Sequence, residues 1–167
     1  MVLDLWEQLH SIFGPAIDRQ PEIAVTNLSS SASQTVIDFM LRNSREVQTA
    51  FYRQGSKEKV TVGSAEEVAT KFASGELIGG FLVEPIFWGL PLPVLGVFSD
   101  ESGSFAIDYE MGPQWTPLTL IGFFEFLRMI RVLDNDAVIR FGKGHFGRKW
   151  QFKFAATLRE YLYDTIT

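Results

Sequence analysis

Apolar residues recur at helical spacing in four segments of the chain. In the first segment they gather near one helical face, and Gly14 followed by Pro15 ends the predicted helix. In the second, Ser64 and Glu67 stand at the spacing of a capping box, and Gly75 supplies a stop. The predicted helices cover residues 3–13, 65–74, 117–133 and 158–166.

Alternating or continuous apolar runs predict the strands. The clearest alternation lies in 104–110, where Phe105, Ile107 and Tyr109 share one face and the opposite face is polar. Residues 29–33 are predicted as a loop. The segments on either side of Ser44-Arg45 suggest a hairpin, although the apolar spacing within 34–43 also suits a helix. The predicted strands are 22–28, 34–43, 46–54, 59–62, 78–88, 92–99, 104–110, 137–141 and 149–154.

The order of these elements indicates the fold class. Strands and helices do not alternate regularly, so a doubly wound parallel sheet is disfavoured. We expect an α+β fold with an antiparallel or mixed sheet packed against a long apolar helix, and with helices near both termini. The 167 residues are enough for one domain, 1–167, with a sizeable core.

The helix predicted over 117–133 needs a cover on nearly all of its surface. Thr116 and Pro117 open it, and its polar positions form only a narrow stripe. Packing on the sheet is the first interpretation. A homodimer through 117–133, as in an acidic secretion-chaperone-like protein, is the other.

Composition limits the chemistry. Apolar residues make up 46% of the chain, and the absence of cysteine excludes disulfides and thiol chemistry and fits a cytoplasmic protein. Acidic residues at the N-terminus argue against a signal peptide. The apolar stretch 81–98 contains three prolines, which indicates buried strands rather than a membrane span.

The charges are unevenly distributed along a chain of net charge −5. Residues 60–127 hold nine acidic residues and one basic residue, whereas 128–153 hold seven basic and two acidic residues. Two interpretations stay open. Either the segments pair within the fold, for example through Arg128, Arg131 and Arg140, or one of them forms a surface that selects a partner.

Residues 142–147 contain the spacing G-x-G-x-x-G among basic and aromatic side chains. Only twenty residues follow Gly147, too few for the rest of a dinucleotide-binding unit, and 149–154 alternates like a strand rather than opening a helix. The acidic balance of the chain argues against nucleic acid. We therefore interpret the stretch as a hairpin loop between two strands.

The sequence offers no established catalytic or metal-binding motif. With two histidines, at 10 and 145, an H-E-x-x-H site is excluded, and G-x-S-x-G is absent. Asp108 and Glu110 share a strand face, but such pairs are usually solvated. We expect no cofactor and no metal.

The acidic segment then favours a protein-binding function with a basic partner. Acidic side chains of one predicted hairpin steer such a partner, and tryptophans in Pro/Gly loops anchor it. The predicted partner-binding residues are Glu84, Trp88, Asp100, Glu101, Asp108, Glu110 and Trp115.

In size, acidity and lack of cysteine, the chain resembles the immunity proteins that neutralise bacterial toxins, although no sequence motif carries this likeness. The resemblance implies inhibition of a basic toxin, such as a nuclease, by direct binding. The alternative is a small-molecule-binding or catalytic α+β domain with an aromatic pocket.

Overall fold

The computed structural model describes residues 4–61, 64–99, 104–142 and 146–163. Five helices and eight strands lie within these ranges. In chain order they are α1 (Leu5–Phe13), β1 (Glu22–Thr26), α2 (Ser30–Arg42), β2 (Ser44–Arg53), β3 (Lys59–Val60), α3 (Ala65–Ala73), β4 (Leu77–Phe87), β5 (Leu90–Pro91), β6 (Leu95–Ser99), β7 (Phe105–Tyr109), α4 (Pro117–Leu133), β8 (Val138–Phe141) and α5 (Arg148–Tyr163).

The strands form one curved sheet in the order β3-β2-β4-β6-β7-β1-β8, with β5 paired to β4 beside this path. Every neighbouring pair is antiparallel. The strand β1 enters between β7 and β8, although it precedes both by many residues. The predicted α+β class, with an antiparallel sheet and helices near both termini, is confirmed.

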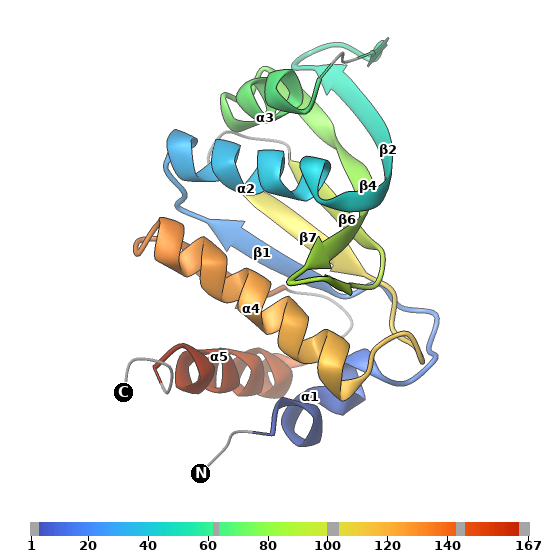
Figure 1. Cartoon of the computed structure of the whole chain (residues 1–167), viewed down its shortest axis with the longest axis vertical. Helices are drawn as coiled ribbons and strands as arrows, with labels where there is room; N and C mark the ends of the chain where they lie inside the picture. Colours follow the sequence, from blue (N-terminus) through green and yellow to red (C-terminus); the bar gives the residue numbers. More distant parts are fainter. Residues whose placement is uncertain (1–3, 62–63, 100–103, 143–145, 164–167) are drawn as a thin grey trace.

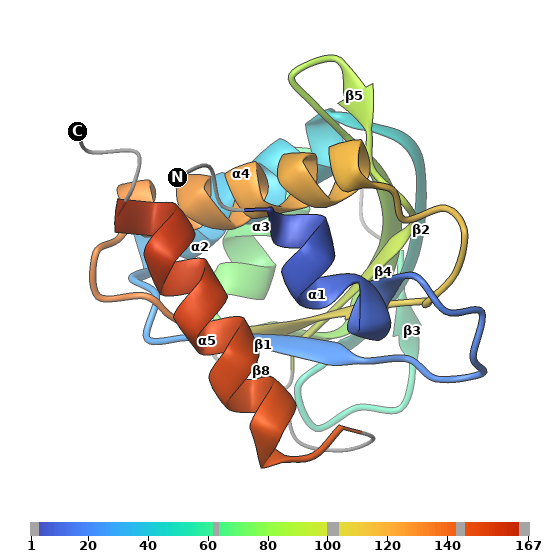
Figure 2. The same ribbon diagram turned by 90° about the horizontal axis from the view of Figure 1, so that it is seen from below.

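The helices lie on one side of the sheet (Figures 1 and 2). The sheet face toward them carries a row of directly paired apolar residues, Phe81, Val97, Ile107, Ile23 and Phe141, all at most 4% exposed. Each helix adds buried aromatic or aliphatic side chains to this core. Burial of large aromatic groups on both layers is the main source of the fold's stability.

Residues 30–42 form helix α2, so the predicted hairpin of 34–43 with 46–54 is wrong. Ser29 caps the helix by accepting a hydrogen bond from the Ala32 amide at 3.2 Å, within what was predicted as a loop. The residues Ala32, Val36, Ile37 and Met40 are buried at helical spacing. The helical alternative therefore prevails, because tertiary packing on one face outweighs the β-propensity of valine and isoleucine.

The predicted strand 149–154 is also wrong, since α5 begins at Arg148 and continues to Tyr163. Its buried side chains, Phe154, Thr157 and Leu158, follow a helical period. The alternation that suggested a strand included Phe152, which is 74% exposed. The predicted hairpin of 137–141 with 149–154 is therefore wrong as well, because the element after β8 is a helix; residues 143–145 between them lie outside the described residues.

The helix α4 begins at the predicted residues, with Thr116 and Thr119 forming a reciprocal cap. Most of its apolar side chains face the sheet and the other helices, but Leu118, Ile121 and Val132 are exposed. A homodimer through this helix stays a prediction.

Candidate functional site

The sheet face that points away from the helices is open, since all described helices pack on the other face. Two rows of directly paired residues cross its centre. The first runs Gln48, Leu82, Gly96, Asp108, Glu22 from β2 to β1. The second runs Ala50, Gly80, Phe98, Ala106, Ala24, Arg140 from β2 to β8.

Large apolar side chains lie on this open face. Leu82 and Phe98 are each 42% exposed, at positions that antiparallel sheets with one wet face usually fill with polar residues. The Phe98 ring lies over two glycines, Gly80 opposite it and Gly96 two residues before it. A Cβ added to Gly80 would collide with the ring, and one added to Gly96 would lie 2.7 Å from its Cε2 atom. Phe98 therefore lies flat on the backbone, with its other ring face outward.

Four carboxylates surround this apolar patch. Asp108 lies directly opposite Glu22 on the neighbouring strand, and Glu84 and Glu110 line the same groove of about 470 Å³. Within the described ranges, the carboxylates of Glu22, Asp108 and Glu110 have no hydrogen-bond or ion-pair partner. The open face thus combines an apolar floor with unneutralised negative charge.

The surroundings of Asp108 disfavour its charged form. The pKa of Asp108 is raised from an ordinary 3.8 to about 6. Partial burial in the groove is the larger cause, and the facing charge of Glu22 is the second. Like charges directly opposite each other in a sheet are unfavourable. A cation placed here would relieve both the burial cost and the repulsion, which is the kind of perturbation that marks binding sites.

Three of the predicted partner-binding residues, Glu84, Asp108 and Glu110, come together in this groove, which we call the acidic groove. Glu84 also forms an ion pair with Arg45 of β2. Asp100 and Glu101 lie outside the described residues. Their membership of the site stays a prediction.

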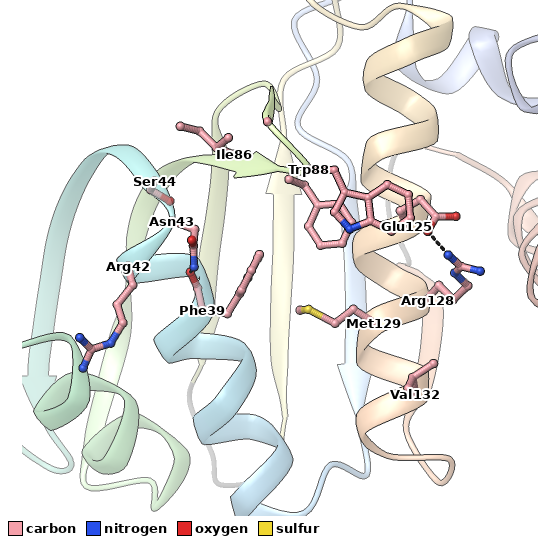
Figure 3. Close-up of a pocket in the computed structure, with 12 residues that line it drawn as sticks. Phe39, Arg42, Asn43, Ser44, Ile86, Trp88, Glu125, Arg128, Met129 and Val132 are labelled. Atoms are coloured by element: carbon pink, nitrogen blue, oxygen red, sulfur yellow. Dashed lines mark hydrogen bonds and ion pairs between the residues drawn. The ribbon is translucent and has the colours of Figure 1, made fainter.

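Trp88 lies elsewhere, at the turn between β4 and β5. Its side chain is 77% exposed and stacks on Phe87, with the ring centroids 5.5 Å apart. The turn closes a groove of about 680 Å³ between the end of α2 and α4, where Phe39 and Met129 lie on opposite sides (Figure 3). Trp88 therefore faces the helical layer rather than the acidic groove.

Trp115 is buried in the core, at 2% exposure, so its ring is not accessible to a partner. It packs edge-on against Phe13, Tyr109 and Phe123, and its indole N–H donates to the Glu110 carbonyl oxygen at 2.9 Å. The proline and glycine residues near Trp115 suggested an exposed loop, but the chain turns inward there and places the ring against Phe13 of α1. The structure does not support the predicted anchoring role of Trp115.

The acidic segment and the basic segment meet at Glu125, which pairs with Arg128 on the same helix. Glu125 is buried, and the Tyr161 hydroxyl of α5 donates to it. Asp108 and Glu110, by contrast, lie on the far side of the sheet from this pair. The acidic groove is therefore not neutralised by Arg128.

The elements on either side of the glycine stretch 142–147 differ from the predicted pair of strands. β8 precedes it and α5 follows it, as a dinucleotide fingerprint requires. However, β8 is an edge strand antiparallel to β1, and α5 is the last element described. Gly142 lies against β1, where its amide donates to the Glu22 carbonyl oxygen at 2.6 Å. Gly144 and His145 lie outside the described residues.

Across the described ranges, no group of three or more histidine and acidic side chains is arranged to hold a metal ion. None of the helices there combines the length and the apolar run needed to cross a bilayer.

Sequence reasoning missed three contributors to the site: Glu22, Leu82 and Phe98. Leu82 and Phe98 belong to the run 81–98, which was interpreted as buried strands. The glycines at 80 and 96 were the available signal, since glycine inside a strand often marks a close approach. Glu22 joins the site only because β1 pairs with β7.

No protein-family model and no curated protein matches the chain. Among solved structures, one similar chain belongs to the crystal structure of the toxic C-terminal tip of CdiA from Pseudomonas aeruginosa in complex with immune protein. The two share 20% identity, over 68% of this chain and 80% of that chain, with a TM-score of 0.45. That score is too low to support a fold or a function.

Proposed function

We propose that the chain is a protein-binding protein whose open sheet face receives a basic protein surface. One observation carries this proposal: Glu22, Glu84, Asp108 and Glu110 surround an exposed apolar patch on an uncovered sheet. Charge of one sign steers a partner of opposite sign, and desolvated apolar contacts hold it.

The finer proposal is inhibition of a basic toxin, as an immunity protein would do. The groove supports it in one respect. A cationic cleft that binds phosphates is complementary to a face with several uncompensated carboxylates, so occupying that cleft would block nucleic acid binding.

The test is affinity capture from the native host with the full chain. The variant Glu84→Gln/Asp108→Asn/Glu110→Gln removes three charges from the groove, and Glu7→Gln/Glu66→Gln/Glu160→Gln removes three exposed charges elsewhere. We expect a basic protein that the wild type and the control variant retain and the groove variant releases. Retention by all three would contradict the proposal. Co-expression then tests whether the chain relieves the toxicity of the captured protein.

A second candidate function is binding of a small aromatic or aliphatic molecule beside Trp88. The groove there has a volume typical of ligand sites and is lined by Phe39, Phe87 and Met129. A fragment screen by thermal shift tests it. A hit should lose its effect in Met129→Lys.

A further inference from the structure

We propose that the acidic groove contains a subsite for one arginine side chain of the protein partner, stacked on the Phe98 ring where that ring covers Gly96. This inference rests on the proposed function and names the chemical group that the open face recognises.

The subsite begins at Gly96 in the first row of paired residues, where the backbone carries no side chain of its own. Leu82 and Asp108 both lie directly opposite Gly96, one on each side of it. Since glycine has no side chain, the Phe98 ring takes the place above Gly96: a Cβ there would be 2.7 Å from Phe98 Cε2 and 3.4 Å from Leu82 Cδ2. A flat group laid on the ring at this point would have Leu82 on one side and the Asp108 carboxylate on the other.

Phe98 supplies a planar surface at the same point. Its ring reaches back along β6 to Gly96, because Cε2 would lie 2.7 Å from a Cβ at that position. Directly paired residues in a sheet have Cβ positions about 5 Å apart, so the ring edge lies beside Asp108. The outward ring face and this carboxylate are therefore within reach of one side chain.

Guanidinium fits this arrangement better than ammonium. It is planar and weakly hydrated, stacks on aromatic rings, and donates two parallel hydrogen bonds to a carboxylate. Lysine offers a compact, strongly hydrated charge that pairs with Asp108 but gains little from the flat ring. Arginine and lysine carry the same charge but differ in shape, so the flat Phe98 ring is what would favour arginine.

Further carboxylates add charge complementarity. Glu22 lies directly beyond Asp108 in the first row, and Glu110 lines the groove together with Glu84, which is paired with Arg45. Arg140 belongs to the second row but is paired with Ala24, on the far side of β1 from Asp108. An extended segment crossing the groove would thus place its arginine on the Phe98 ring, while Glu22 and Glu110 receive other basic residues.

The test is an NMR titration of the full-length labelled protein with two peptides of equal charge, acetyl-(Gly-Arg)4-amide and acetyl-(Gly-Lys)4-amide. We expect shifts of the Leu82, Gly96, Phe98 and Asp108 amides, with the arginine peptide bound about three- to fivefold more tightly. Phe98→Leu should abolish this preference. Asp108→Asn should weaken binding about tenfold, whereas the distant control Glu160→Gln should not.

Equal affinity for both peptides at these amides would overturn the arginine subsite and leave the basic partner standing. Shifts confined to another surface, or no binding of either peptide, would also overturn the subsite, and the capture experiment would then decide the proposed function separately. If the Phe98→Leu variant does not fold, the subsite is tested instead with the wild-type protein and a peptide in which citrulline replaces each arginine. Citrulline keeps the planar shape without the charge, and binding as tight as that of arginine would refute the proposal.

Discussion

Asp108 holds a charge where the folded protein disfavours it. Its pKa is raised to about 6, first by burial and second by Glu22. For an acid this sign means that the folded state binds its proton more tightly than the unfolded state. Protonated Asp108 therefore contributes to the stability of the folded protein. This contribution is fully present at pH values below the pKa of the unfolded state, near 3.8, and is lost as the pH rises through 6.

We therefore expect Asp108→Asn to stabilise the protein at neutral pH. The charged groups near it on this face are the carboxylates of Glu22, Glu84 and Glu110. Glu84 is paired with Arg45, and Arg140 lies on the strand beyond that of Glu22. After allowance for solvent screening in the open groove, the gain is about 1 kcal/mol at pH 7.5 and vanishes below pH 4. Urea unfolding at both pH values measures it. A variant less stable than wild type at pH 7.5 would show that these surroundings do not disfavour the charged form of Asp108.

The two tryptophans that resembled each other in sequence context should behave oppositely. Trp115→Ala removes a buried ring and its hydrogen bond to Glu110, so we expect a loss of about 3–5 kcal/mol in the free energy of unfolding. Trp88→Ala alters an exposed ring and should change it by about 0.5 kcal/mol at most. Chemical denaturation of both variants checks this. A similar loss for the two would refute the core position of Trp115.

The turn between β4 and β5 places a bulky residue, Trp88, in a backbone conformation that favours asparagine or glycine. Trp88 and Gly89 both have positive φ, at 52° and 75°, the conformation of a two-residue hairpin turn that favours Asn-Gly. A bulky residue at the first position of such a turn is an outlier, because a Cβ is disfavoured at positive φ.

Replacing Trp88 by asparagine should therefore stabilise the hairpin by about 0.5–1 kcal/mol. Gly89→Ala is the matched control. No atom lies within 4 Å of an added Cβ, so its expected loss of about 1 kcal/mol comes from the backbone alone. Thermal unfolding of both variants distinguishes turn strain from packing, and a destabilised Trp88→Asn would show that the ring contributes to the fold.

Helices α4 and α5 are joined by a buried polar group. Glu125 is 7% exposed, pairs with Arg128 and accepts a hydrogen bond from the Tyr161 hydroxyl. The proximity of this carboxylate and burial both raise the pKa of Tyr161, with burial the larger cause. Such groups specify how elements dock, because only one arrangement satisfies them.

Removing Glu125 should therefore cost more than removing the tyrosine hydroxyl. Glu125→Ala leaves Arg128 uncompensated, and we expect a loss of about 3 kcal/mol. Tyr161→Phe loses one hydrogen bond and should cost about 1–2 kcal/mol. Equilibrium unfolding measures both, and equal small losses would show that the pair is solvated in solution.

At the scale of the whole molecule, we expect the carboxylates of the open sheet face to govern association with a basic partner. Reversal of Glu84, Asp108 and Glu110 to lysine should slow association about tenfold or more and flatten its dependence on salt. Reversal of Glu7, Glu66 and Glu160 serves as the control for net charge. Stopped-flow mixing with the captured partner at low and high salt checks it. Equal slowing by both triple variants would mean that total charge, not the groove, steers the encounter.

Local patterns predicted much of this architecture. The caps at Ser64 and Thr116 and the alternation of Phe105, Ile107 and Tyr109 gave the correct element types, because each depends on neighbours in sequence. Residues 34–43 and 149–154 failed because valine, isoleucine and aromatic residues suit both a strand and a packed helix. Packing against the sheet decided between them.

The sequence by itself determined the α+β class, the acidic segment and the candidate carboxylates Glu84, Asp108 and Glu110. Only the tertiary structure decided that these carboxylates share one groove, that Glu22 faces Asp108, that Phe98 lies outward over glycines, and that Trp115 is buried. The reason is strand pairing. Which face of a strand is open, and which strand lies beside it, depends on hydrogen bonds between segments far apart in the chain, and no local pattern encodes that register.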